Sequence, residues 1–568
     1  MREWQSFGRF LDKPLDEIYN EGNTAQFYAV LPIKTARTVA ESLDSFQKED
    51  FMKLCDLHTH SVFSDGTMTP EQLIDEAVGA GLYAIALTDH NVVEGLERFL
   101  SYAADKPIEA VPGIEFTTSY KGQELHILGL FLPRESYEAV TEYVRLAHER
   151  KEVSNLILAS RLNENGYPID YEKLKAARPD GKVNRAHFAA ALVDAGLIES
   201  RDEAFRTILS PSYGWYEEYE RLDTLTTIRF IRSLGAVPVW AHPLFHVDRQ
   251  TCEELIPVFK VNGLVGVETI YSTYTEDDTA FLKKICSKYE LLESGGSDFH
   301  GANKPDIAIG TGRGNLRIPY SFYERLLERR NRIESYGCLL KRTAYQQENL
   351  LLDDGDFAPH KGMLEKVDPD NSFRPFYGDT TVFDLDDDIK KKVAAIQDVL
   401  YSQNPECFCA RLAPSTIHMT LHDLDASVSQ DEVFQAMKQN EAGLRRKCES
   451  LPIPAFTIRM RTNFVCDSVQ KSLVLNVLPE TPGDWAKLAL LYEWVDEVRP
   501  LPPDRKLYPH ITLAYYNHDG FSAESMSKLK KTVLELNQTG FAFTIDTAKL
   551  YYQHFTDMNS YENIFKIQ

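Results

Sequence analysis

Short apolar runs that end in polar residues recur along the first 300 residues of the chain. They lie within residues 51–60, 84–90, 110–115, 124–130, 236–243 and 294–301. Each run has the length and composition of a buried strand. Helix-like stretches lie between them, such as residues 70–80 with the N-cap candidate Thr69. This alternation predicts a parallel α/β barrel or sheet, in which the carboxyl ends of the strands meet on one face.

Residue types that bind metals stand at the ends of these predicted strands. His58 and His60 are two apart, so both imidazoles point to the same side of a strand. Asp65 follows on a turn marked by glycine. The later strand ends carry His90, Glu115, His126, His242, Asp298 and His300. One such histidine alone is more often an ordinary hydrogen-bonded residue, but their recurrence favours a metal site.

Residues 51 to about 320 resemble the PHP family (polymerase and histidinol phosphatase), motif by motif and in the same order. The resemblance implies a distorted (βα)7 barrel, over about residues 51–340, that hydrolyses phosphate esters with two or three divalent metal ions. It implies three ligand sets: His58, His60, Glu115 and Asp298; Glu115 as a bridge, with His126 and His242; and Asp65, His90 and His300. Because no thiolate takes part, we expect the ions to be Mn, Fe or Zn.

The stretch 135–220 is mostly helical in pattern and too long for one crossover helix, which predicts a helical insertion over the barrel mouth. Its segment 182–187 resembles the insertion of the PHP subgroup that acts on nucleotides and RNA 5′ ends. That resemblance makes Arg185 and His187 candidates for binding a substrate phosphate. A solvated helix start with an ordinary arginine accounts for either residue equally well.

The C-terminal third contains the pattern His-apolar-Thr-Leu twice. The first copy holds His418 and Thr420, and the second holds His510 and Thr512. In a strand, the histidine and threonine of each copy face the same way, and the apolar residue between them faces a core. If the two strands are neighbours, one imidazole could take a proton from the nucleophile while the other protonates the leaving oxygen. The threonine hydroxyls could hold the phosphoryl oxygens, and no metal is needed.

This duplication resembles the 2H phosphoesterase family, over roughly residues 376–568. The resemblance implies an α+β domain that opens cyclic or 2′-5′ phosphodiesters. Residues 345–375 are acidic and marked by proline and glycine, which predicts a linker between the two domains. Residues 1–50 contain a strand-like stretch, 25–32, and a helix-like stretch, 35–46, and match neither family.

Composition and charge limit the expected location of the protein and the kinds of molecule that it can bind. No segment approaches the apolar length of a membrane helix, and the first residues lack the apolar region of a signal peptide. The eight cysteines are scattered, so we expect reduced thiols in a cytoplasm. The net charge of −23 disfavours non-specific binding to long nucleic acid, which depends on basic residues. Nucleotides and short RNA ends remain compatible, because bound metals would supply local positive charge.

Together these features predict a bifunctional phosphoesterase, with a metal-dependent barrel and a metal-independent C-terminal domain. One alternative is a 5′-3′ exoribonuclease or 3′,5′-bisphosphate nucleotidase whose C-terminal domain only binds RNA. A second alternative is a nucleotide sensor that is not an enzyme. The sequence leaves the natural substrate, the metal and the oligomeric state open.

Overall fold

The computed structural model describes residues 53–177, 182–349, 354–502 and 505–568. The strand and helix expected within residues 1–50 lie outside these ranges. The described residues contain two sheets of eight strands each. We refer to residues 53–334 as the barrel region and to the described residues from 335 to 568 as the C-terminal region, and we describe each by itself.

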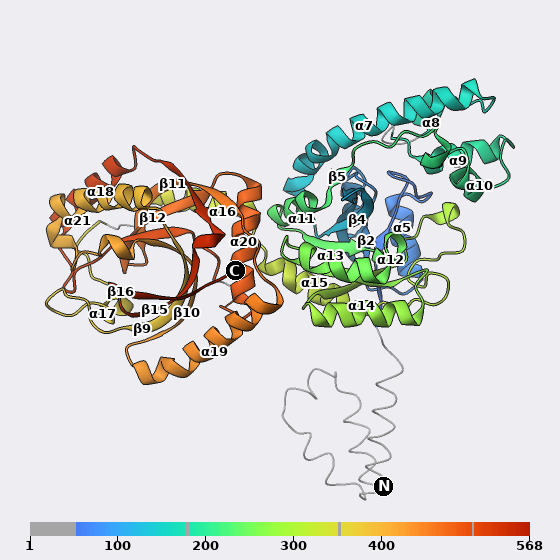
Figure 1. The fold of residues 1–568 in the computed structure, drawn as a ribbon. Coiled ribbons are helices and arrows are strands. Elements are labelled where there is room, and N and C mark those ends of the chain that lie inside the picture. The colour runs from blue at the N-terminus through green and yellow to red at the C-terminus, as the bar shows by residue number, and fades with distance from the viewer. Residues whose placement is uncertain (1–52, 178–181, 350–353, 503–504) are drawn as a thin grey trace, which may run out of the picture. The chain divides into compact units, whose positions relative to one another are not determined.

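The barrel region is built on a mainly parallel sheet with the order β1-β2-β3-β4-β6-β7-β8, and β5 pairs with β3. Its strands are β1 Cys55–Thr59, β2 Ala84–Leu87, β3 Glu109–Tyr120, β4 Gln123–Leu130, β5 Leu222–Asp223, β6 Val237–Ala241, β7 Gly266–Tyr271 and β8 Leu292–Gly296. A parallel bridge from Thr59 to Phe299, just beyond β8, joins the two ends of this order. The sheet therefore curls into a barrel-like form (Figure 1).

The parallel pattern is broken once, at β4. The turn Lys121-Gly122 has positive φ angles of 51° and 82°, and it joins β3 to β4 as a two-residue hairpin. Such turns favour antiparallel pairing, and β4 runs antiparallel to both β3 and β6. The amino end of β4 therefore lies at the same edge as the carboxyl ends of the other strands.

Helices cover the outside of this sheet. They are α5 Pro70–Gly79, α6 Leu96–Ala103, α11 Thr224–Ser233, α12 Pro243–His246, α13 Arg249–Lys260, α14 Glu276–Lys288 and α15 Tyr320–Arg332. The next helix, α16 Tyr336–Asn349, belongs to the C-terminal region, because its Leu339 lies in the apolar core of that region. The helix expected at residues 70–80 is confirmed as α5. Its N-cap Thr69 forms a capping box: the Thr69 Oγ1 accepts a hydrogen bond from the Gln72 backbone N–H, and the Gln72 side chain accepts one from the Thr69 N–H.

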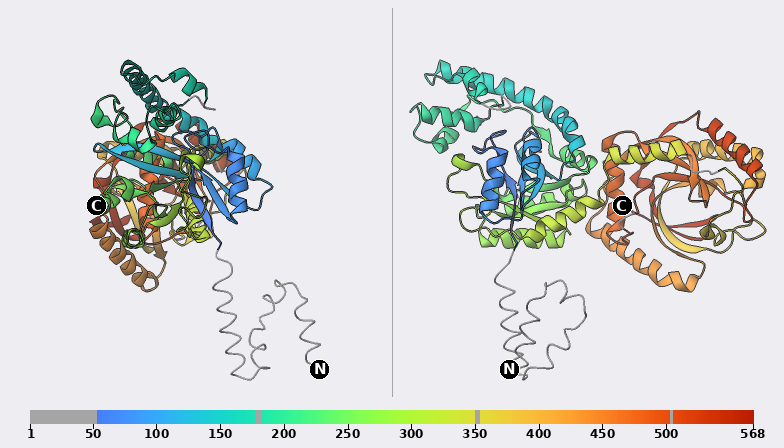
Figure 2. Two further views of the ribbon diagram at one scale, coloured as in Figure 1. Left: turned by 90° about the vertical axis from the view of Figure 1, so that its right-hand side faces the viewer. Right: turned by 180° about the vertical axis from the view of Figure 1, so that it is seen from behind.

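A helical insertion follows β4, as the sequence predicts. It consists of α7 Tyr137–Glu164, α8 Tyr171–Ala176, α9 Arg185–Asp194 and α10 Arg201–Arg206, which lie together as a separate lobe in both views of Figure 2. These helices bury their own small apolar core, centred on Leu158, Phe188 and Leu192. Because that core is local, the insertion is a packed unit and not one long crossover.

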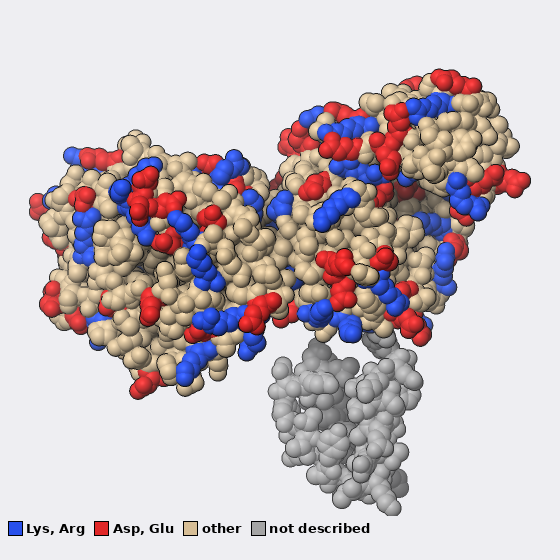
Figure 3. Space-filling view, in the orientation of Figure 1, with Lys and Arg blue, Asp and Glu red and all other residues tan. Residues whose placement is uncertain are grey.

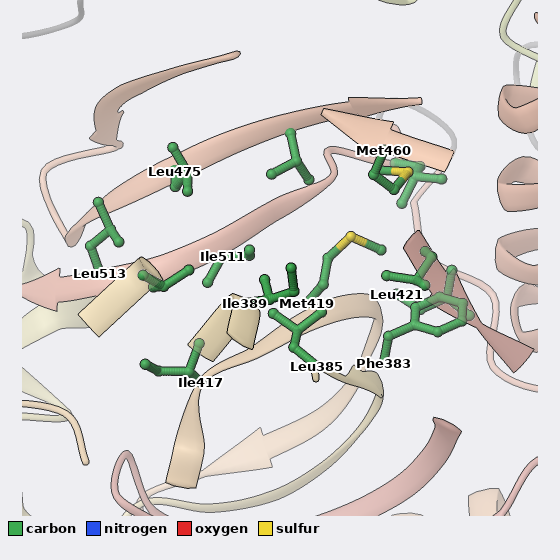
Figure 4. Packing of buried hydrophobic residues seen from close by; sticks show 14 of the residues in the cluster. Phe383, Leu385, Ile389, Ile417, Met419, Leu421, Met460, Leu475, Ile511 and Leu513 are labelled. Atoms are coloured by element: carbon green, nitrogen blue, oxygen red, sulfur yellow. The ribbon is translucent and has the colours of Figure 1, made fainter. Parts of the chain in front are cut away.

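The C-terminal region is a curved antiparallel sheet with the order β14-β11-β12-β13-β10-β9-β15-β16. Its strands are β9 Tyr377–Asp384, β10 His418–Ser427, β11 Thr457–Ser468, β12 Ser472–Pro479, β13 His510–Tyr515, β14 Ala542–Asp546, β15 Leu550–Asp557 and β16 Ser560–Lys566, and its helices are α17 Lys361–Leu364, α18 Asp387–Gln403, α19 Gln430–Ser450, α20 Pro482–Asp496 and α21 Ala523–Leu536. Its apolar core includes Phe383, Met419 and Ile511 (Figure 4). The region is therefore α+β in character.

The segment expected to be a linker, residues 345–375, differs from that expectation. Its first residues continue α16, and α17 follows within it. Met363 and Val367, four residues apart, are fully buried and pack with Phe376 and Tyr515. Because the segment is acidic overall, its sequence did not reveal that Met363 and Val367 are buried. The residues around α17 are therefore part of the folded C-terminal region.

None of the helices in the described ranges combines the length and the apolar character needed to cross a bilayer. On the face seen in Figure 3, the described acidic and basic side chains are interspersed over both regions.

Candidate active sites

All nine predicted metal ligands converge at one edge of the barrel sheet. They fall into overlapping groups whose ligand atoms lie within 4.8 Å of one another. The groups are His58, His60 and Asp298; His58, Glu115 and His242; His90, Glu115 and His126; His60, Asp65, His90 and His300; and His126, His242 and His246. The residues come from the ends of six strands and their following loops, so the barrel curvature is what assembles them.

In the first group, ring nitrogens and carboxylate oxygens converge on one small space. The Nδ1–H of His58 donates to Glu268 (2.9 Å), so its Nε2 carries a lone pair. That Nε2 lies 3.0 Å from the Nε2 of His60 and 3.2 Å from Glu115 Oε2. The Nε2 of His60 also lies 3.2 Å from Asp298 Oδ1. Converging acceptors with little room between them suit a bound cation.

Glu115 stands between two groups. Its Oε1 lies 2.8 Å from His126 Nδ1 and 3.0 Å from His242 Nε2. Its Oε2 lies 3.0 Å from His90 Nδ1 and close to the first group. One fully buried carboxylate thus faces different imidazoles with each oxygen, which is the geometry of a bridging ligand.

His126 reaches this edge because β4 is antiparallel. It is the fourth residue of β4, close to the amino end of that strand. Glu115 lies in the middle of the long strand β3, and the remaining ligands stand near or beyond the carboxyl ends of their strands. The alternation along the sequence did not reveal this reversal, but the two-residue turn before β4 was the available signal.

The turn after β1 is fixed by close contacts. A Cβ on Gly66 would lie only 2.3 Å from the backbone oxygen of His60, so a side chain cannot be accommodated there. Asp89 accepts hydrogen bonds from the Ser61 N–H (2.7 Å) and the Ser64 hydroxyl (2.5 Å). These contacts bring Asp65 back to the cluster, where its Oδ1 lies 3.2 Å from His300 Nε2.

Several functional neighbours were not predicted. Glu268 in β7 holds the His58 ring and accepts the His242 backbone N–H (2.7 Å). The carboxylate of Asp298 accepts the Tyr271 hydroxyl (2.8 Å) and the Lys304 ammonium (2.5 Å). A glutamate in the middle of the apolar run 266–271 was the signal that could have revealed Glu268.

His246 lies beside the cluster, although it is not among the nine predicted ligands. Its ring centroid lies 4.7 Å from that of His126 and 5.3 Å from that of His242. It stands four residues after His242, across the short helix α12, and this helical spacing brings the two rings to one side.

The cluster carries more buried negative charge than neutral imidazoles can balance. Burial favours a neutral carboxyl, yet His90 and His58 hold the pKa of Glu115 well below its usual value. Lys304 and His300 do the same, against burial, for the pKa of Asp298. Burial lowers the pKa of His60, but Asp298 and Glu115 raise it to about 9. Without cations the protein must bind protons here, and metal ions would replace them.

Orphaned polar atoms test whether these residues fit metal ions. Asp65 Oδ1, His90 Nδ1, Glu115 Oε2 and His246 Nε2 are buried atoms without a hydrogen-bond partner among the described residues. Buried polar atoms are rarely left unsatisfied. All four belong to the groups above, and all are metal-ligand types, so the donor set fits divalent ions.

The insertion contacts the cluster by a residue other than those predicted. The side-chain amide of Asn184 donates to Asp65 Oδ2 (3.3 Å). His187 is buried, and its Nδ1 accepts the Asn184 backbone N–H (3.1 Å), as part of the cap of α9. The Arg185 guanidinium lies 4.4 Å from the ring centroid of Tyr216. The capping role of His187 explains why a histidine was found at this spacing.

The two His-apolar-Thr copies lie on neighbouring antiparallel strands, β10 and β13. Met419 pairs directly with Ile511, and both are fully buried in the core (Figure 4). The flanking residues therefore project from the opposite face, where His418, Thr420, His510 and Thr512 all line one hollow of about 460 Å³.

The two histidines of this hollow are held by different neighbours. The Nδ1 of His510 lies 2.7 Å from the Tyr508 carbonyl oxygen and donates to it, which leaves its Nε2 for a substrate. The His418 ring lies 5.0 Å, edge to face, from that of Tyr561. Burial is the main cause that lowers the pKa of His418 to about 4, and the nearby His510 contributes to this lowering. His418 is therefore a neutral base near pH 7.

The barrel-like sheet gathers imidazoles and carboxylates into clusters that could bind metal ions, as in metal-dependent hydrolases. The PHP domain model matches residues 56–220. A 5′-3′ exoribonuclease of Haemophilus influenzae is 31% identical over 249 residues, which cover 44% of this chain and 90% of that protein. The chain belongs to the PHP family.

Two further comparisons show how much of the chain resembles known proteins. A 3′,5′-nucleoside bisphosphate phosphatase of Chromobacterium violaceum is 28% identical, over 45% of this chain and 90% of that protein. A solved structure of Escherichia coli LigT complexed with 3′-AMP is 16% identical and covers 34% of this chain and 96% of that chain, with a TM-score of 0.22. At that TM-score the second site rests on its own geometry. The expectation of an enzyme acting on phosphoester bonds is confirmed by the named relatives.

Proposed function

We propose that the chain is a bifunctional phosphoesterase. The barrel region hydrolyses phosphate mono- or diesters of nucleotides or RNA ends with the help of divalent ions. The C-terminal region opens cyclic or 2′-5′ phosphodiesters without metal. The observation that carries the first activity is the convergence of nine candidate ligand side chains, with Glu115 among them, at one edge of the sheet. The second activity is supported by the two paired motifs that share one hollow.

In the barrel site, the three ligand sets expected from the sequence would hold two or three ions, and His60 is also within reach of the third set. Ions of this kind lower the pKa of water and polarise the phosphoryl group. The protein fixes the ligands: Glu268 accepts the Nδ1–H of His58 and so turns its Nε2 towards the ion site, and Lys304 keeps Asp298 charged.

A cavity beside His90 supports a nucleotide-sized anionic substrate. It has a volume of about 410 Å³ and lies between the barrel edge and the insertion. Its wall includes Lys151, Lys175 and Lys182, along with the ring of Phe63. Cationic side chains and an aromatic face are the groups that bind phosphates and bases. Arg185 and His187 remain candidates for contact with a longer substrate, although their present contacts are structural.

The relatives narrow the substrate class of the barrel. One is named for 5′-3′ exoribonuclease activity and another for the hydrolysis of 3′,5′-nucleoside bisphosphates. We therefore favour phosphate groups on nucleosides or RNA ends. The exoribonuclease and nucleotidase alternatives stay open for this region.

In the C-terminal site, the neutral His418 would take a proton from water while the water oxygen bonds to phosphorus. His510 would enter the step protonated and give the proton on its Nε2 to the ribose oxygen whose bond to phosphorus breaks, so that His418 ends with one proton more and His510 with one fewer. Thr420 and Thr512 would donate hydrogen bonds to the other phosphoryl oxygens. The balance is one water consumed and one phosphomonoester formed, which the barrel could hydrolyse next.

A substrate screen tests both activities at once. The protein is incubated with adenosine 2′,3′-cyclic phosphate, adenosine 3′,5′-bisphosphate and 5′-phosphorylated RNA, with Mn²⁺ or with EDTA. We expect ring opening in both conditions and hydrolysis of the other two only with Mn²⁺. Ring opening that stops in EDTA would reduce the C-terminal region to a binding module. No turnover of any substrate would favour the nucleotide sensor.

A further inference from the structure

Three cationic side chains line the hollow that holds the two His-apolar-Thr copies. They are Lys366, which follows α17, Lys471 in the turn between β11 and β12, and Arg505 in the loop before β13. These three segments are far apart in the sequence and meet only in the folded region. The copies themselves need no cation, because imidazole and hydroxyl groups can serve the reacting phosphate.

The positions of two of these cations are fixed by packing. The ammonium of Lys366 lies 5.0 Å from the ring centroid of Phe376 and 5.4 Å from that of Tyr515. Lys471 lies against Gly362, where an added Cβ would stand 3.1 Å from its Cε and 3.3 Å from its Nζ. Only a residue without a side chain leaves this space for Lys471.

The turn that presents Lys471 is strained. Val469 and Gln470 have φ angles of 45° and 58°, a region that a β-branched residue such as valine rarely adopts. The carboxylate of Asp467 holds the turn by accepting the Gln470 N–H (2.8 Å). Backbone strain of this kind is retained where a particular placement is needed.

The cationic side chains are only partly paired, although the carboxylates of Glu365, Asp379, Asp423 and Asp425 also line the hollow. Arg505 forms an ion pair with Asp423 (2.6 Å), but within the described ranges neither Lys366 nor Lys471 is within ion-pair distance of a carboxylate. Burial lowers the pKa of Lys471, and the charges of Lys366 and Arg505 lower it further. Like charges gathered in a hollow, in a chain of net charge −23, are relieved by a bound anion.

We propose that Lys366, Lys471 and Arg505 bind a second phosphate group of the substrate of the C-terminal site. This inference rests on the proposed ring-opening function and specifies its substrate class: a cyclic phosphodiester that carries a further phosphate. That phosphate is either the 5′-phosphate of a nucleoside cyclic phosphate or the backbone phosphate of an RNA end. In ring opening the second phosphate is unchanged. The product of the first kind of substrate is a nucleoside bisphosphate, a substrate class proposed above for the barrel.

The test compares three substrates in EDTA: adenosine 2′,3′-cyclic phosphate, the same compound with a 5′-phosphate, and the dinucleotide ApA with a terminal 2′,3′-cyclic phosphate. We expect at least one doubly phosphorylated substrate to have a kcat/KM about tenfold or more above the first, as charge-assisted contacts produce. Preference for the 5′-phosphorylated mononucleotide identifies a terminal phosphate, and preference for the dinucleotide identifies a backbone phosphate.

Lys366→Met and Lys471→Met should each reduce this preference towards unity. Lys438→Met is the matched control, because Lys438 lies over the Phe434 ring on α19, away from the hollow. Thermal melting of each variant reports on folding, and Lys471→Arg should retain the preference if Lys471→Met loses it.

Equal kcat/KM for all three substrates in the wild-type protein would overturn the inference while leaving the proposed function intact. If no substrate is opened, the proposed function fails, and binding decides the inference separately. Calorimetry in EDTA should then give at least about tenfold tighter binding of adenosine 3′,5′-bisphosphate than of 3′-AMP, lost in Lys471→Met. Equal affinities, or a difference that persists in Lys471→Met, would overturn it.

Discussion

The two candidate sites, in the barrel region and in the C-terminal region, use charge in opposite ways. The barrel site buries carboxylates among imidazoles from six strand ends and leaves ligand atoms without partners. The C-terminal site repeats one tripeptide on two adjacent strands and contains no carboxylate among its four motif residues. A buried negative cluster calls for cations, whereas two imidazoles, one accepting a proton and the other giving one, can move protons without a metal. The difference predicts that each site can be disabled without the other.

The largest effect should come from Glu115→Gln. An amide keeps the shape but removes the charge that faces two ligand groups, so metal content measured by elemental analysis should fall. Hydrolysis of adenosine 3′,5′-bisphosphate with Mn²⁺ should drop by roughly 10³-fold, at the upper end of the loss for one electrostatic group. Ring opening of a cyclic phosphate in the same preparation serves as the control. Full metal content and rate in this variant would show that Glu115 does not bridge.

His418→Ala and His510→Ala should produce the opposite pattern. Each removes one partner of a proton transfer, which is worth about 10²–10⁴-fold in rate. Ring opening should be lost to that extent, while metal content and bisphosphate hydrolysis stay unchanged. His518→Ala is a suitable control, because that imidazole contacts only Asp519 among the ion pairs described for it. Survival of ring opening in the double variant would contradict the assignment of both histidines.

Glu268→Gln should have an intermediate effect. Glu268 is not itself a proposed ligand, but it accepts hydrogen bonds from the ring of His58 and from the backbone N–H of His242. Loss of such an orienting contact typically costs 10–100-fold in metal affinity or activity. Excess Mn²⁺ should restore part of the activity, which loss of folding would not allow. Glu276→Gln, in the first turn of α14, is the matched control and should behave as wild type.

The sequence predicted the ligands of the barrel better than their surroundings. Residue type and position at a strand end mark a histidine such as His58, because both can be read locally. The reversal of β4, the approach of His246 and the support from Glu268 depend on packing between distant segments. The apolar anchors Met363 and Val367 were hidden in the same way by acidic neighbours. Local patterns therefore identified the candidate ligands, and only the fold showed which residues position them.

The smallest effect, and the sharpest test of the contrast, is the pH dependence of ring opening. Burial first and the neighbouring His510 second lower the pKa of His418 to about 4. A lowered pKa means that the neutral, proton-accepting form is present above pH 4 and is lost only as the pH falls through that value. The acid limb of kcat/KM in EDTA should therefore lie near pH 4, below the value of about 6.5 for an unperturbed histidine. A ¹³C-labelled histidine titration, with the His418 resonance identified by its absence in His418→Ala, should give the same midpoint. An acid limb between pH 6 and 7, with no transition of His418 there, would assign the base to another group.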